Sequence, residues 1–211
     1  MRHGVLLALS GLLLLKGASA TAQEHRFEIA PFAGYETSGS YPVRTSFTVD
    51  RLRANGNVSF GTFLDYSLTP YFEPEFLWAH NPSSFSQRNA LTGVYSKAFN
   101  SQIDQFQFGG SFLFRSPEAR WRPYFGVGLG FTHDANTGGN PNRTAFAYSL
   151  GGGAKYYASK HVGFRFDARY MPTYGSSSPG IVCDPFGFCY TAEVHNYLNR
   201  GNFGVGIILR P

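Results

Sequence analysis

Charged residues at every second position are the side chains in this sequence most able to do chemistry. In several short segments they alternate with apolar residues, so an extended strand would gather the charges on one face. The nine residues of this set are Arg26, Glu28, Asp65, Glu73, Glu75, Arg122, Arg165, Asp167 and Arg169. Such a face could line a narrow pore or provide acid–base catalysis. Because a buried charge must be paired, the nearly balanced signs favour a structural network of salt bridges instead.

Two cysteines, Cys183 and Cys189, lie close together in the segment CDPFGFC. Pro185 and Gly187 between them can turn the chain. In an exported protein this spacing predicts a disulfide that closes a small loop. A metal site would need more ligands, and His195 is the one candidate nearby. The two-residue spacing of thioredoxin-like redox motifs is absent.

Three histidines, His80, His133 and His195, fall near the ends of predicted strands. An enzyme would need a nucleophile or a base that a third group orients. Serine and aspartate residues are sequence neighbours of two of these histidines, but no catalytic motif is matched. We therefore predict no catalytic residue, no metal site and no cofactor.

The first 22 residues have the features of a secretory signal peptide. Arg2 precedes an apolar core from Val5 to Leu15, and small residues follow it at positions suited to cleavage after Ala20 or Ala22. We predict a signal peptide over 1–22 and one mature domain over 23–211. Removal of Arg2 and Lys16 would lower the formal net charge from +5 to +3, and the chain has no basic cluster, so nucleic-acid binding has no support.

Eight segments of the mature chain alternate between apolar and polar residues, which is the pattern of β-strands. They span 25–36, 56–67, 71–80, 103–115, 121–133, 145–158, 161–171 and 197–210. Three connections are short, at 68–70, 116–120 and 159–160, and alternate with four long polar loops at 37–55, 81–102, 134–144 and 172–196. Regular alternation of short and long connections predicts an antiparallel up-and-down arrangement.

Volume determines which face of these strands points outward. Aromatic residues make up 17% of the chain, and most of them share the apolar face. An eight-stranded barrel has an interior just wide enough for modest side chains, so it could not hold these rings. We therefore expect the aromatic face to contact lipid, where strands must close into a barrel. A soluble, lipocalin-like barrel with inward aromatics is the alternative.

The chain from about Arg26 to Arg210 resembles the small eight-stranded outer-membrane β-barrels of the OmpA/OmpX type. The resembling stretches combine glycines and aromatics in FEIAPFAGY (27–35), PYFGVGLGF (123–131), LGGGAKYYASKHVGFRFDARY (150–170) and FGVGIILR (203–210). Such barrels often end in an aromatic residue, whereas this chain ends Leu209-Arg210-Pro211. Pro31 and Pro74 fall within strands, where each removes a donor, so we expect bulges or register shifts there.

The resemblance implies an all-β, eight-stranded antiparallel transmembrane barrel in the bacterial outer membrane. Its expected surroundings are outer-membrane lipid and lipopolysaccharide, and its expected state is a monomer. We predict a non-enzymatic role in structure, envelope integrity or surface adhesion, with the four long loops available to a surface ligand. The alternatives are a narrow porin-like channel and a lipid-modifying barrel enzyme.

Overall fold

The computed structural model describes residues 26–37, 39–44, 49–88, 93–137, 142–174, 180–183, 189–192 and 197–211. The predicted signal peptide lies outside these residues and stays a prediction. Within the described residues, no helix is long and apolar enough to cross a membrane.

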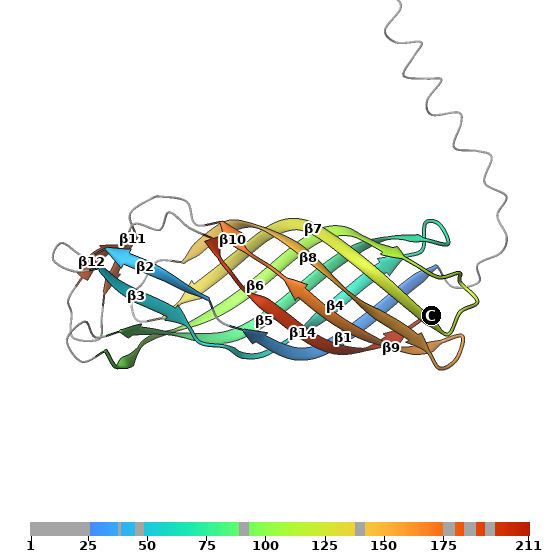
Figure 1. Ribbon diagram of the computed structural model, residues 1–211, viewed down its shortest axis with the longest axis horizontal. Helices are drawn as coiled ribbons and strands as arrows, with labels where there is room; N and C mark the ends of the chain where they lie inside the picture. Colours follow the sequence, from blue (N-terminus) through green and yellow to red (C-terminus); the bar gives the residue numbers. More distant parts are fainter. Residues whose placement is uncertain are drawn as a thin grey trace, which may run out of the picture.

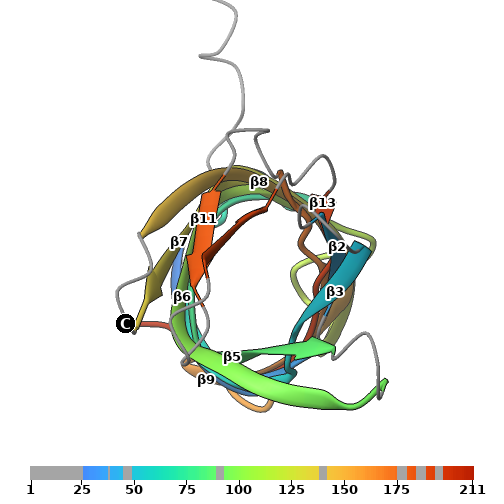
Figure 2. The same cartoon turned by 90° about the vertical axis from the view of Figure 1, so that its left-hand side faces the viewer.

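Eight antiparallel strands form a closed barrel, as the sequence predicts (Figures 1 and 2). They are β1 (Phe27–Thr37), β4 (Asn57–Tyr66), β5 (Phe72–Arg88), β6 (Tyr95–Leu113), β7 (Trp121–Asn136), β8 (Arg143–Tyr157), β9 (Val162–Tyr170) and β14 (Gly201–Leu209). Each of these strands pairs with the next in the sequence, and β14 pairs with β1 to close the barrel. The short connections and the C-terminus lie at one end, which we call the short-turn end (Figure 1).

Additional strands extend the opposite end, which we call the outer end (Figure 1). β2 (Ser40–Arg44) and β3 (Val49–Ala54) form a hairpin that pairs with β5 through β3. β10 (Thr173–Tyr174) pairs with β13 (Tyr197–Leu198), and β11 (Gly180–Cys183) pairs with β12 (Cys189–Ala192) in a separate two-stranded sheet.

The prediction of a polar loop over 81–102 is wrong. β5 has 17 residues and β6 has 19, so most of this range is strand, with a register shift between Phe85 and Ser86. Phe85 and Phe99 stack with ring centroids 4.9 Å apart. Beyond the lipid the outward face need not be apolar, so the alternation that reveals a membrane strand is lost there.

The aromatic face points outward, which confirms the membrane-facing register and contradicts the soluble alternative. Phe108 is 68% exposed and Phe166 is 43% exposed, while Arg165, the residue before Phe166, is fully buried. An apolar surface of this extent, running around a closed barrel, is the outward band of a membrane barrel.

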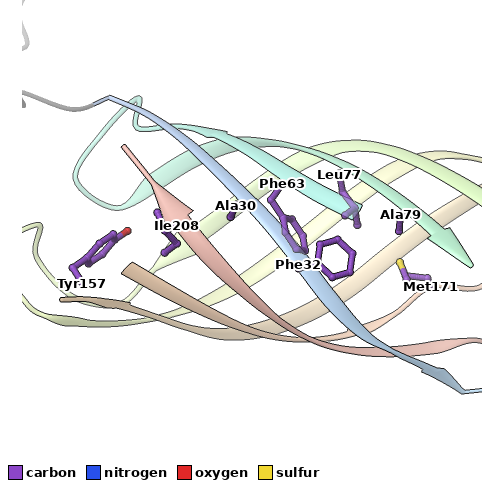
Figure 3. Packing of buried hydrophobic residues seen from close by; sticks show 8 residues of the cluster. All are labelled: Ala30, Phe32, Phe63, Leu77, Ala79, Tyr157, Met171 and Ile208. Carbon is purple, nitrogen blue, oxygen red and sulfur yellow. The ribbon is translucent and has the colours of Figure 1, made fainter. Parts of the chain in front are cut away.

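Apolar side chains also fill part of the interior. Phe32, Phe63 and Leu77 project into the barrel and lie along its axis in Figure 3. Lumen glycines make the room: a Cβ atom at Gly61 would lie 2.9 Å from the Phe32 ring, and one at Gly204 would lie 3.0 Å from it. This part of the interior is therefore packed with side chains.

Both prolines within strands are accommodated without the bulges we expected. Pro31 lies opposite Thr62 and Pro74 lies opposite Gly110, and neither ladder changes register at these positions. Between β1 and β14 the paired residues skip Ala30 and Pro31 but resume with the same offset. The missing proline donor thus leaves a local gap in pairing and does not bend the strand out of register.

Candidate functional site

A buried ammonium group is central to the charged lumen. Lys155 on β8 is fully buried and contacts three carboxylates on three other strands. Its Nζ lies 2.9 Å from Glu28 Oε2 and 2.7 Å from Asp65 Oδ2, and it also donates to Glu73. One side chain thus ties β8 to β1, β4 and β5 across the interior.

Two arginines on β9 bind the neighbouring carboxylates. Arg165 Nη1 lies 2.8 Å from Asp65 Oδ2, and its Nη2 donates to Glu75. Arg169 Nη1 lies 2.7 Å from Glu75 Oε1, and its Nη2 lies 3.2 Å from Asp167 Oδ2. The Arg165 guanidinium also lies 3.5 Å above the Phe63 ring, so the apolar and ionic parts of the interior pack against each other.

Two further arginines close the short-turn end of the network. Arg210 donates to Glu28 and lies 3.7 Å from the centroid of the Tyr157 ring, whose hydroxyl donates to the same carboxylate at 2.9 Å. Arg122 Nη1 lies 3.5 Å from Glu73 Oε1, and its Nη2 donates to the Pro70 carbonyl at 2.7 Å. The penultimate residue of the chain is therefore a lumen residue.

The network is balanced in charge and removed from solvent. Its five acids are Glu28, Asp65, Glu73, Glu75 and Asp167, and its five bases are Arg122, Lys155, Arg165, Arg169 and Arg210. Apart from Asp167 at 6% and Arg210 at 15%, these side chains are at most 2% exposed. We call these ten residues the lumen network.

The structure brings together eight of the nine charged residues singled out from the sequence. The exception is Arg26, whose side chain is exposed just before β1 begins. Lys155 and Arg210 join the network although the sequence analysis did not single them out. Lys155 continues the period-two pattern of Ser149, Gly151 and Gly153, so alternation could have found it.

A second, smaller cluster lies toward the outer end of the lumen. Arg200 Nη1 lies 3.6 Å from Glu36 Oε1, and its Nη2 lies 3.5 Å from Asp134 Oδ1. Gln105 donates to Glu36 at 3.4 Å. The Arg200 Nε and Nη1 atoms are buried without a hydrogen-bond partner. We call Glu36, Asp134 and Arg200 the outer cluster.

One group of carboxylates has the spacing of a metal site. Oxygens of Glu28, Asp65 and Glu73 lie within 4.8 Å of one another. The Lys155 ammonium already contacts all three and supplies the compensating positive charge. A divalent cation would have to displace this lysine, so the residues do not fit a metal.

The cysteine prediction concerns side chains that the structure does not describe. The backbone places Cys183 directly opposite Cys189 in the β11–β12 hairpin. Residues opposed in an antiparallel pair have Cα atoms about 4.5 to 5.5 Å apart, which a disulfide can bridge. The disulfide stays a prediction, and His195 lies outside the described residues.

Of the three histidines singled out from the sequence, the two that the structure describes form hydrogen bonds on the outward face. His80 Nδ1 lies 2.9 Å from Asp104 Oδ1, and His133 Nδ1 lies 2.8 Å from Thr144 Oγ1. A triad would need one histidine to bridge an acid and a hydroxyl. Within the described part of the chain, neither histidine does so.

The family model described as "Outer membrane protein beta-barrel domain" matches residues 7–207. No match was found among curated protein sequences.

Solved structures with the same fold are distant in sequence. OprG from Pseudomonas aeruginosa has a TM-score of 0.66 at 13% identity, covering 89% of this chain and 97% of that one. Neisserial surface protein A has a TM-score of 0.51 at 12% identity, covering 88% and 97%. The outer membrane protease OmpT from Escherichia coli has a TM-score of 0.50 at 9% identity, covering 88% and 97%. These likenesses concern the fold alone, but the family match spans nearly the whole chain. The protein belongs to the outer membrane protein β-barrel family and resides in the bacterial outer membrane.

Proposed function

We propose that the protein is a non-conducting, non-enzymatic barrel with a structural role and a surface-binding role at its outer end. The observation that carries the proposal is the lumen network, whose buried side chains bridge strands across the interior. A channel at this point would have to pass between side chains that are almost entirely buried.

Opening the lumen would separate charges that now neutralise one another. Lys155 contacts carboxylates from three strands, and Arg165 contacts Asp65, Glu75 and Asp167. Each buried ion left without its partner costs several kcal/mol. The network therefore supports a closed barrel rather than the porin-like alternative.

The surface role follows from the strands that extend the outer end. The β2–β3 hairpin pairs with β5, and β5 pairs with β6 as far as Arg88 and Tyr95. Hydrogen-bonded strands present side chains at fixed spacing. A surface ligand would thus meet an ordered sheet.

Single-channel recording in a planar bilayer tests the proposal. We expect no conductance steps from the refolded wild type. A variant in which Glu73, Lys155 and Arg165 are all replaced by alanine loses charges of both signs from the network and provides the positive control, because it should conduct if it folds. Regular steps from the wild type, of the size seen for the variant, would contradict a closed lumen.

A further inference from the structure

A row of polar residues crosses the outward face of four neighbouring strands. His80 on β5 lies opposite Asp104 on β6, Asp104 lies opposite His133 on β7, and His133 lies opposite Thr144 on β8. Outward residues of these strands are otherwise mostly apolar where they cross the membrane. We call these four residues the polar row.

Hydrogen bonds hold the polar row in place at the edge of the lipid-facing surface. Asp104 Oδ1 accepts a hydrogen bond from Trp78 Nε1 at 3.2 Å, besides its contact with His80. The His80 and Asp104 side chains are 19% and 27% exposed. These groups are neither buried as core residues nor fully solvated.

An aromatic row lies directly on the short-turn side of the polar row. Its members, opposed in the same way across β5 to β8, are Trp78, Phe106, Phe131 and Phe146. The Phe106 and Phe131 rings stack with centroids 5.2 Å apart. Because aromatic side chains gather where hydrocarbon meets headgroups, the polar row begins at the outer boundary of the lipid.

Basic residues follow on the outer side of the polar row. Arg53 on β3 and Lys97 on β6 both lie opposite Ser86 on β5, one on each side of it, and Arg88 lies two residues further along β5. All three basic side chains are exposed. Asp104 is the only acidic residue whose side chain the structure describes on this outward face.

We propose that this face binds a phosphorylated glycolipid of the outer leaflet. Its acyl chains would lie on the aromatic row, its sugar hydroxyls would bond with the polar row, and its phosphates would pair with Arg53, Arg88 and Lys97. The proposal deepens the surface role proposed above. It needs the outer-membrane location but not the closed lumen.

Distance along the strand favours a glycolipid over a glycerophospholipid. Ser86 is six residues beyond His80, which is about 20 Å at the rise of a β-strand. The strands of a barrel are tilted, so the height above the lipid boundary is smaller but still several sugar or headgroup widths. The phosphate of a glycerophospholipid lies at the boundary itself. Sugar rings are needed to bring phosphates to Arg53 and Lys97.

Two opposite faces of the barrel differ in a way that fits this proposal. At the outer ends of β1, β14 and β9, the opposed outward residues are Thr37, Gly201 and Tyr170. Tyr170 donates to Asn199 at 2.6 Å. No described residue of this row is charged, whereas the polar and basic residues named above lie on β3, β5, β6, β7 and β8. We therefore expect binding on that side of the barrel.

A binding measurement with purified protein in nanodiscs tests the proposal. The probes are lipopolysaccharide with a phosphorylated core, the same lipopolysaccharide after phosphatase treatment, and phosphatidylglycerol. We expect the wild type to bind the phosphorylated glycolipid at least tenfold more tightly than either other probe. We expect R53E/R88E/K97E to lose at least tenfold and H80A/D104N to lose a few-fold.

A matched variant controls for non-specific attraction. Arg115, Arg120 and Lys160 are exposed basic residues at the short-turn end, so R115E/R120E/K160E makes the same change in net charge at the opposite rim. It should bind like the wild type, and heat-modifiable migration in a gel shows that all variants are folded. Equal losses in the two triple variants, or equal binding of phosphatidylglycerol, would overturn the proposal. Channel recordings do not bear on this outcome, so either proposal can fail alone.

Discussion

The two ionic clusters in this lumen have different construction. In the lumen network each carboxylate except Asp167 has a cationic nitrogen within 3.0 Å, and the charges balance. In the outer cluster Arg200 lies 3.5 and 3.6 Å from its two acids, and two of its three nitrogen atoms lack a hydrogen bond. The lumen network also has two atoms without a partner, Asp65 Oδ1 and Arg122 Nε, but the other polar side-chain atoms of these two residues are bonded. Both clusters are buried, so burial alone does not distinguish them. The difference indicates that the short-turn end is held rigidly and the outer end more loosely.

The strongest test of this difference is removal of the central ammonium. Lys155→Met would leave Glu28, Asp65 and Glu73 together in the interior without the one cation that contacts all three. Each acid would keep a single arginine partner. Removing one partner of a buried ionic group typically costs about 3 to 5 kcal/mol, so we expect a loss of stability in that range. Urea unfolding of the refolded protein in micelles measures it. Lys160→Met, in an exposed turn, is the control and should change the midpoint little; similar midpoints for both variants would show that the network is not stabilising.

A double-mutant cycle measures coupling within the same network. Asp167 accepts from both Arg165 and Arg169, and the Tyr124 hydroxyl also donates to it. We expect Asp167→Ala to destabilise by about 1 to 3 kcal/mol, because it leaves three donors with one acceptor fewer. Adding Arg169→Ala should recover part of the loss, with a coupling free energy of about 0.5 to 3 kcal/mol. Purely additive losses in urea unfolding would mean that these groups act independently.

Replacing the buried cation of the outer cluster should reduce the stability of the barrel less than replacing Lys155 does. Arg200→Met removes a cation whose acids are 3.5 Å or more away, and it leaves the buried Glu36 with Gln105 as a donor. We therefore expect a loss of about 1 to 3 kcal/mol. The comparison is with Lys155→Met under identical conditions, since both replace a fully buried cation with an uncharged side chain. A loss as large as that of Lys155→Met would remove the distinction between a rigid short-turn end and a looser outer end.

Alternation predicted the membrane part of this molecule well and the outer part poorly. For β9 it placed Phe166 outward and Arg165 inward, because a strand facing lipid on one side must alternate. The same rule extends to Lys155, but this residue stands between Ala154 and Tyr156 and has no opposite charge near it in the sequence. Its partners Glu28, Asp65 and Glu73 are 82 to 127 residues away, so only the three-dimensional register brings them together.

Two other residues show where sequence reasoning lacks information. Arg26 shares the parity of Glu28 but stands just before β1 begins, where alternation no longer fixes the direction of a side chain. At the other end of the chain, the alternation along β14 directs Arg210 toward the lumen. Its role depends on the pairs of β1 with β14 that close the barrel. Whether a terminal residue belongs to a strand is a matter of one or two positions, which hydrophobic patterns do not resolve.

The smallest effect on the barrel is expected from the cysteines. The β11–β12 hairpin forms its own two-stranded sheet, separate from the sheet that closes the barrel. We predict that Cys183 and Cys189 are joined, and that C183S/C189S leaves the urea midpoint and the heat-modifiable migration of the barrel unchanged. A bond that closes a short loop removes chain entropy within that loop only, so its stabilisation stays in the hairpin.

Thiol titration of protein purified without reductant should detect no free cysteine, whereas two reactive thiols would contradict the disulfide. A shift of the barrel midpoint in C183S/C189S would instead show that the outer-end hairpin is coupled to the closed sheet, and would make the outer end more rigid than its ionic cluster indicates.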